Sequence, residues 1–185
     1  MRRLRSAVAL AASAGALASP GGAAALDGDR SGDTDAADQC VVRVTGHEES
    51  GRLLTTAPVC HPTIAEALAY AGVDLGKGGS DLTFEEIEES GALAAAADSS
   101  GLLGVHWDGA NRTGASITIT GGACSGGHHN LASSWVNRIS STWNGCPSVL
   151  FYDGFDKSGS HELTTTSTVN LGALNNASNS IGYAT

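Results

Sequence analysis

The sequence predicts an α+β protein with a small mixed module at residues 40–103 and an all-β half at residues 104–185. Two observations lead to this fold class. In the first part, apolar residues follow capping residues at the spacing of amphipathic helices. From Gly104 onward the period changes to two, most clearly in the alternating stretch Ser-Ile-Thr-Ile-Thr at 116–120.

The N-terminus has the pattern of a secretory signal peptide. Three arginines within the first five residues precede a run of small apolar residues over 7–18, and Ala-Ala-Ala at 23–25 offers a cleavage site. The apolar run is too short for a transmembrane helix. We therefore expect a signal peptide over 1–25, a flexible acidic leader over 26–39, and a mature protein that is secreted and holds no membrane segment.

The charge and composition of the chain argue against two classes of protein, nucleic-acid binders and enzymes with a large core. The chain has 10 Lys and Arg against 19 Asp and Glu, a formal net charge of −9. A protein held on nucleic acid by phosphate contacts needs a basic surface, so no nucleic-acid partner is expected. The low aromatic content of 5% and the 25 glycines favour short strands and turns over a large enzyme core.

Four cysteines in an exported chain predict two structural disulfides. Four cysteines allow three pairings, and we favour the local pairs Cys40 with Cys60 and Cys124 with Cys146. The first pair closes a hairpin in which 41–44 is a strand and 49–51 a turn. The chain has no C-x-x-C motif, which argues against a zinc or redox site.

The rest of the first module is predicted to be helical. Each of two helices opens with a capping box: Thr63 with Glu66, and Thr83 with Glu86. The first helix ends before Gly72, and the second runs over 84–97 with a break at 90–91. The glutamates at 85–89 are interpreted as a solvated helix face rather than paired catalytic acids. In the second half, strands are expected at 149–152 and 162–169.

The β half contains an internal repeat. Residues 107–116 align without a gap on 152–161 at an offset of 45, matching aromatic, acid, base and glycine positions. Asn130-Leu131 recurs as Asn170-Leu171, and 136–141 recurs as 175–180. The repeat predicts two similar four-stranded Greek keys, at about 104–146 and 147–185.

These motifs resemble the βγ-crystallin family. Each Greek key of that family carries an aromatic residue followed seven residues later by Gly, as in Trp107 to Gly114 and Tyr152 to Gly159 here. A later calcium motif has two Asn or Asp, two variable residues, then Ser or Thr, and Ser. The chain departs from the family pattern at four positions: Arg112 and Lys157 replace a second aromatic, Val136 replaces the first Asn or Asp, and Asn179 replaces Ser or Thr.

The resemblance implies two weak calcium sites, each shared between the two keys. It implies one site formed by Asn137, Arg138 and Ser140 with Asp153 or its neighbours, and a second formed by Asn176, Ala177 and Asn179 with Asp108 or its neighbours. Arg138 and Ala177 would supply only backbone carbonyls. Calcium takes six to eight hard oxygens, and a site of mostly neutral oxygens predicts an affinity on the order of 10⁻⁴ to 10⁻³ M. The alternative is that these Asn and Ser turns only satisfy backbone groups.

The remaining polar residues suggest no catalytic or cofactor-binding site. His106, His128, His129 and His161 are interpreted as surface loop residues, and no G-x-S-x-G motif raises a nucleophile. The three tryptophans, at 107, 135 and 143, are expected in the core rather than in a sugar platform.

The sequence thus favours a secreted, non-enzymatic βγ-crystallin-like protein that weak calcium binding stabilises. Two alternatives stay open because fold alone does not decide function. One is a secreted protease inhibitor or toxin-like effector, because bacterial metalloproteinase inhibitors and killer-toxin-like proteins are similar to the same family. An inhibitor would present a rigid loop within 40–60 or 124–146. The other alternative is a module that binds a cell-surface glycan.

Overall fold

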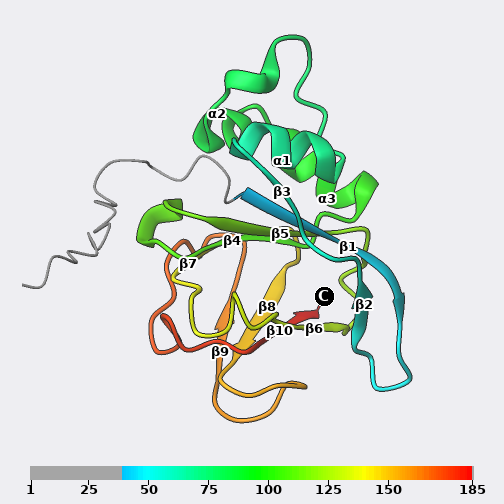
Figure 1. Ribbon diagram of the computed structural model, residues 1–185, viewed down its shortest axis with the longest axis vertical. Coiled ribbons are helices and arrows are strands. Elements are labelled where there is room, and N and C mark those ends of the chain that lie inside the picture. The colour runs from blue at the N-terminus through cyan, green and yellow to red at the C-terminus, as the bar shows by residue number, and fades with distance from the viewer. Residues whose placement is uncertain (1–38, 185) are drawn as a thin grey trace, which may run out of the picture. The chain divides into compact units, whose positions relative to one another are not determined.

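The computed structural model describes residues 39–184. The expected signal peptide over 1–25 lies outside the described residues, as does most of the leader expected over 26–39. Gln39 is an exception, because it is the first residue of a strand and pairs with His61 and Ser116. The fold has helices on one face of a β-sheet and a second sheet on the other face (Figure 1).

The first sheet has six strands in the order β2-β1-β5-β4-β7, with β3 paired to β1. The strands are β1 (Gln39–His47), β2 (Leu53–Thr55), β3 (Val59–His61), β4 (Gly104–Trp107), β5 (Ser116–Thr120) and β7 (Ser141–Asn144). β1 runs parallel to β5, and the other pairs are antiparallel. The segments 40–103 and 104–185 therefore share this sheet.

The second sheet has four antiparallel strands in the order β6-β10-β8-β9. They are β6 (His128–Asn130), β8 (Ser148–Tyr152), β9 (His161–Thr164) and β10 (Ser180–Ala184). β9 ends earlier than the strand expected over 162–169. The prediction was too long because Thr165 and Thr168 form a turn, in which Thr168 Oγ1 accepts a bond from Thr165 N at 3.0 Å.

Each repeat contributes one segment to the sheet that contains the other strands of its partner repeat. β6 comes between β5 and β7 in the chain but pairs with β10 in the second sheet. In return, Asn170 of the second repeat forms a bridge with Ser141 of β7 in the first sheet. The carboxylate of Glu162 then accepts bonds from the backbone N–H groups of Gly172 and Leu174 at 2.7 and 2.8 Å. These contacts tie the exchanged segment to β9.

Short helices cover the outer face of the first sheet, as expected from their caps. They are α1 (Ile64–Ala71), α2 (Phe84–Glu89) and α3 (Ala92–Ser100). Elsewhere there is a single 3₁₀ turn, η1 (Gly79–Asp81), and a tight turn with positive φ values, η2 (Ala110–Arg112). Thr63 and Thr83 cap α1 and α2, and the second cap is a complete capping box. Gly72 takes the left-handed conformation that ends α1. The break at 90–91 separates α2 from α3, as predicted.

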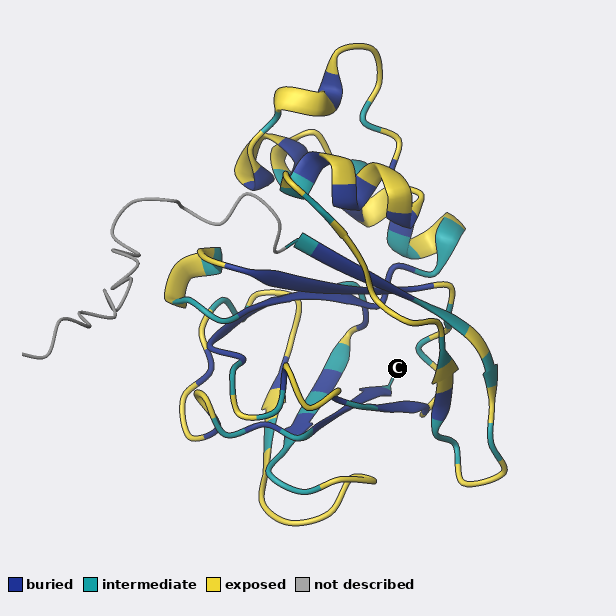
Figure 2. Cartoon of the chain, viewed as in Figure 1, coloured by how far each residue is buried: buried dark blue, intermediate teal, exposed yellow. Residues whose placement is uncertain are grey.

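The first sheet is buried on both faces at its centre (Figure 2). Val105 and Trp107 of β4 pack against the helices, where Phe84 meets the Trp107 ring edge-on at 4.6 Å between centroids. Ile117 and Ile119 of β5 point the other way, into the core between the two sheets. A strand covered on both faces needs no polar side for solvent, so β4 and β5 are buried throughout.

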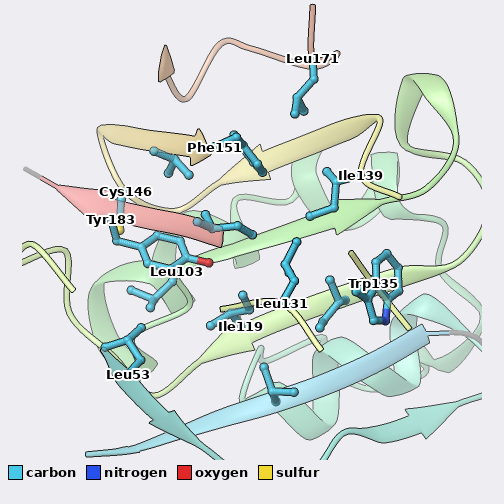
Figure 3. Close-up of a cluster of buried hydrophobic side chains, with 14 of the residues drawn as sticks. Leu53, Leu103, Ile119, Leu131, Trp135, Ile139, Cys146, Phe151, Leu171 and Tyr183 are labelled. Carbon is cyan, nitrogen blue, oxygen red and sulfur yellow. The ribbon is translucent and has the colours of Figure 1, made fainter. Parts of the chain in front are cut away.

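The core between the sheets draws on both repeats (Figure 3). Leu131, Trp135 and Ile139 from the first repeat pack with Phe151 and Tyr183 from the second. All three tryptophans are buried, as expected. Both predicted disulfides are confirmed: Cys40 joins Cys60, and Cys124 joins Cys146. Within residues 39–184, no helix has the length and apolar content to cross a membrane.

Candidate functional site

The internal repeat gives each half of the chain one hairpin turn, and the two turns are equivalent. In the first turn, Asp108 Oδ1 accepts a bond from Ala115 N at 2.9 Å. In the second, Asp153 Oδ1 accepts from Ser160 N at 2.8 Å. The aligned aspartates therefore have the same local role, which is to close the base of the turn.

The backbone of the two turns also matches. Asn111 and Arg112 take the left-handed conformation, with φ of 54° and 61°, and so do Asp156 and Lys157, with φ of 55° and 59°. Such values are uncommon for residues other than Gly. Both turns are therefore held in the same unusual conformation by their surroundings.

Each turn is held by the last serine of a motif segment, 136–141 or 175–180. Ser141 Oγ donates to Gly109 O at 2.6 Å and accepts from Arg112 N at 2.8 Å. The equivalent bonds of the second half join Ser180 Oγ to Gly154 O at 2.7 Å and to Lys157 N at 3.2 Å. We call the contact of turn 108–114 with segment 136–141 junction 1, and that of turn 153–159 with segment 175–180 junction 2.

The two motif segments also contact each other reciprocally. Asn137 N donates to Ser178 O at 2.9 Å, and Asn176 N donates to Ile139 O at 2.8 Å. Ser140 Oγ donates to Asn176 Oδ1 at 3.0 Å. The two junctions are thus related by an approximate two-fold axis and are joined by direct hydrogen bonds between their motif segments.

The exchanged segments add a second pair of equivalent contacts, which the sequence did not predict. Asn170 Oδ1 accepts from Asn111 N, and its amide donates to Asn111 Oδ1, both at 2.7 Å. Asn130 makes the same two bonds with Asp156, at 2.9 and 2.7 Å. Bonds from Asn130 and then from His128 hold the pKa of Asp156 below its usual value. The recurring Asn-Leu pair was the only signal of this role.

The pairing of aspartates with motif segments differs from the expected one. The resemblance assigned Asp108 to segment 175–180 and Asp153 to segment 136–141. Instead, Asp108 Oδ2 accepts from Arg138 Nη2 at 2.6 Å, and the Asn179 side-chain amide donates to the backbone carbonyl of Asp153. Each aspartate lies against the motif segment of its own half, because the chain exchange involves β6 and Asn170 rather than the motif segments.

The two junctions differ in their electrostatics. Junction 1 contains the guanidinium of Arg138, whereas the equivalent residue of junction 2 is Ala177. Two positions further on, Ser140 has its hydrogen bond to Asn176, but the equivalent Asn179 has an unpartnered oxygen. Among the described residues, no donor reaches Asn179 Oδ1, although that atom is buried.

Of the four histidines expected in surface loops, only His161 is exposed, and it lies in β9. His106, His128 and His129 are 0%, 2% and 6% exposed. The surface interpretation was therefore wrong for these three, because β4 and β6 are covered by the opposite sheet or by the β1–β2 connection. Burial, and secondarily the neighbouring imidazole, lowers the pKa of His106 to about 3 and that of His129 to about 4.

No carboxylate or histidine cluster for a transition metal is present in the described part of the chain. No group of three or more His, Cys, Asp and Glu side chains lies close enough there to hold a metal ion. Any cation at the junctions would therefore depend on amide and carbonyl oxygens together with the carboxylate of Asp108 in junction 1, or those of Asp153 and Asp156 in junction 2. No family model, curated protein or solved structure matches this chain.

Proposed function

We propose that this chain is a secreted, non-enzymatic βγ-crystallin-like protein that binds calcium weakly at junction 2 and is stabilised by it. The two disulfides favour an oxidising compartment. The strand order supports two Greek keys that exchange one segment. In the second sheet it is β9-β8-β10-β6, and in the first sheet β5-β4-β7 is followed by Asn170 in the same arrangement.

The observation that carries the calcium proposal is the unpartnered oxygen of Asn179. A buried polar atom without a partner is costly, so an acceptor left open in a folded protein points to a missing donor or cation. The neighbouring Asp153 supplies a carboxylate and a backbone carbonyl, and the carbonyl already lies against Asn179. Hard oxygens of these types are the ligands that calcium prefers.

The residues proposed to hold the ion are therefore Asp153, Asn179 and their neighbours Asn176 and Ala177, the last two through their backbone carbonyls because the Asn176 side-chain oxygen already accepts from Ser140. A calcium ion there would bind Asn179 Oδ1 and neutralise Asp153. It would also connect the second hairpin turn to the segment that contacts Ile139 of the first half. This connection gives the physical reason why binding would stabilise the whole fold rather than one loop.

The test is the thermal unfolding midpoint of the oxidised mature protein in about 10 mM calcium against excess chelator. A dissociation constant of about 10⁻³ to 10⁻⁴ M stabilises the folded state by about 1.4–2.7 kcal/mol at that concentration. The expected rise in Tm is roughly 3–10 °C, with no comparable rise in magnesium.

Asn179→Ala should abolish this rise, and the equivalent substitution in junction 1, Ser140→Ala, should preserve it. Both variants remove a polar side chain at the same position of the repeat, so general loss of stability does not explain a difference between them. A calcium response that survives in Asn179→Ala contradicts the assignment to junction 2.

One observation favours a second candidate function, inhibition of a secreted protease. Phe155 lies at the tip of the second hairpin turn. Its exposure of 48% is greater than that of any other Phe, Tyr or Trp that the structure describes. The turn is rigid, because Ser158 N and Oγ both donate to Phe155 O, at 3.1 and 2.7 Å. Inhibitors present a pre-organised loop of this kind. It lies outside the 40–60 and 124–146 segments in which such a loop was expected.

A panel of secreted metalloproteases and serine proteases tests this candidate. Inhibition by the wild type that is lost in Phe155→Ala supports it. The first hairpin turn has Ala110 at the equivalent position, so that turn is not expected to inhibit. If excess wild-type protein slows no protease, the inhibitor function is rejected. The glycan alternative has less support, because all three tryptophans are buried.

A further inference from the structure

Arg138 and Ala177 occupy equivalent positions in the two motif segments, and only Arg138 carries a charge. The Arg138 guanidinium has three fixed contacts. It donates to Asp108 Oδ2 at 2.6 Å and to Ser134 O at 2.9 Å, and it lies over the Trp135 ring at 5.0 Å from the centroid. These contacts fix a positive charge beside the carboxylate of the first hairpin turn.

Junction 2 has the same carboxylate and lacks the cation. Within residues 39–184, Asp153 forms no ion pair, and the Ala177 methyl group offers none. The carboxylates of Asp108 and Asp153 otherwise have the same bond at the base of their turns. At the positions of Arg138 and Ala177, the two junctions therefore differ in whether a side-chain cation lies beside this carboxylate.

The side-chain oxygen at the fifth position of each motif segment, Ser140 or Asn179, also has a partner in junction 1 and, among the described residues, none in junction 2. Ser140 Oγ is satisfied by Asn176 in junction 1, whereas Asn179 Oδ1 in junction 2 has no partner. Junction 1 thus needs no ion, because its Asp108 carboxylate is paired with Arg138 and its Ser140 hydroxyl is hydrogen-bonded. In junction 2, the equivalent carboxylate has no cation and the equivalent side-chain oxygen has no partner from the part of the chain that the structure describes.

From this comparison we infer that Arg138 is a tethered cation that occupies junction 1 in place of calcium. The chain would then bind one calcium ion, at junction 2, and junction 1 would stay formed in its absence. A guanidinium and a calcium ion compete for Asp108 Oδ2, since both require that oxygen. This inference rests on the proposed calcium binding at junction 2.

The test compares calcium stoichiometry by equilibrium dialysis and Tm in chelator for the wild type, Arg138→Ala and Ala177→Arg. Arg138→Ala installs the residue that junction 2 already has. We expect it to lower Tm in chelator by about 1–4 °C, as for loss of a partly exposed ion pair. Calcium should reverse this loss, and the number of ions per chain should rise from one to two.

Ala177→Arg should do the opposite at junction 2, abolishing calcium binding. Arg43→Ala serves as the matched control, because the Arg43 guanidinium also donates to a backbone carbonyl and lies over an aromatic ring, both of Tyr70, which belongs to neither junction. It should leave the stoichiometry at one.

The outcomes separate this inference from the proposed function. A wild type that binds one ion and an Arg138→Ala variant that also binds one overturn the role of Arg138 but keep calcium binding at junction 2. Two ions in the wild type also overturn that role. No binding by either protein overturns both. Binding by Arg138→Ala alone supports the tethered cation and contradicts calcium binding at junction 2.

Discussion

The His106 ring of β4 and the Tyr183 hydroxyl of β10 meet across the core, with Nε2 and the phenol oxygen 3.4 Å apart. On its other side, His106 Nδ1 lies 2.8 Å from Thr142 Oγ1, and that hydroxyl donates to Asn144 Oδ1 at 2.7 Å. The Asn144 amide in turn donates to Thr164 Oγ1 at 2.9 Å. The network therefore joins the two sheets through buried polar side chains.

This network fixes His106 in its neutral form. Because the Thr142 hydrogen is directed to Asn144, Thr142 accepts from His106 Nδ1–H, and His106 Nε2 is left to accept from Tyr183. Burial also raises the pKa of Tyr183 well above its usual value, so the phenol keeps its proton. A proton added to His106 would place an unpaired charge inside the core.

Acid should destabilise the fold in a defined pH window. The folded pKa values of His106 and His129, about 3 and about 4, lie below the unfolded value of 6.5. Between these limits the unfolded chain binds protons that the folded chain does not, so stability falls as pH falls below about 6.5. Each group contributes about 1.4 kcal/mol per pH unit.

Urea unfolding from pH 7.5 to 4 measures the slope of stability against pH, and His106→Gln should reduce that slope. An unchanged slope in that variant would show that His106 does not titrate in this way.

Removal of the Tyr183 hydroxyl should weaken the connection between the sheets. Tyr183→Phe leaves His106 Nε2 buried without a donor, which costs about 1–2 kcal/mol. Tyr152→Phe is the control, since Tyr152 is less buried and no side-chain bond to its hydroxyl is present among the described residues. Chemical unfolding compares the two variants. Equal losses would mean that the His106–Tyr183 contact contributes nothing specific.

Gly159 should be irreplaceable because of the aspartate beside it. A Cβ there would lie 1.9 Å from Asp153 Oδ1, in a left-handed conformation with φ of +80°. Gly78 has nearly the same φ, +82°, with nothing within 4 Å of its Cβ position. Gly78→Ala should therefore cost about 1–2 kcal/mol for the backbone alone, and Gly159→Ala more than about 3 kcal/mol. If the two losses are equal, packing of Asp153 against Gly159 is unimportant.

The loops that the two disulfides close should contribute a similar stabilisation, and the Cys124–Cys146 disulfide should add a contribution from its burial in the core. The pairs are separated by 20 and 22 residues, which predicts about 3 kcal/mol for each in the chain-entropy model. Replacing Cys40 and Cys60 by Ala, and separately Cys124 and Cys146 by Ala, measures both by thermal unfolding. The second replacement should cost more, because Cys146 is fully buried in the core between the sheets. Equal losses would contradict that additional contribution.

Features set by neighbouring residues were predictable from the sequence. The Thr83 cap, the helix end at Gly72 and the two disulfides depend on contacts of short separation, and all are present. The repeat also predicted equivalent turns, because the same side chains recur at a fixed offset.

Features set by long-range topology were not predictable. β1 pairs in parallel with β5, so that Gln39 meets Ser116, and no local pattern indicates such a partner. His106 alternates with Val105 and Trp107, which predicts a solvent-facing histidine. It is buried because both faces of this sheet are covered. The pairing of Asp108 with Arg138 likewise depends on which segment the two halves exchange.

The most direct test of calcium binding at junction 2 is a calcium titration followed by amide chemical shifts in ¹H–¹⁵N NMR spectra. We expect saturable shifts at Asp153, Asn176, Ala177 and Asn179, and much smaller shifts at Asp108 and the segment 136–141. Shifts that are absent up to about 10 mM calcium, well above the expected dissociation constant, would contradict calcium binding. Equal shifts at both junctions would contradict the special role of junction 2.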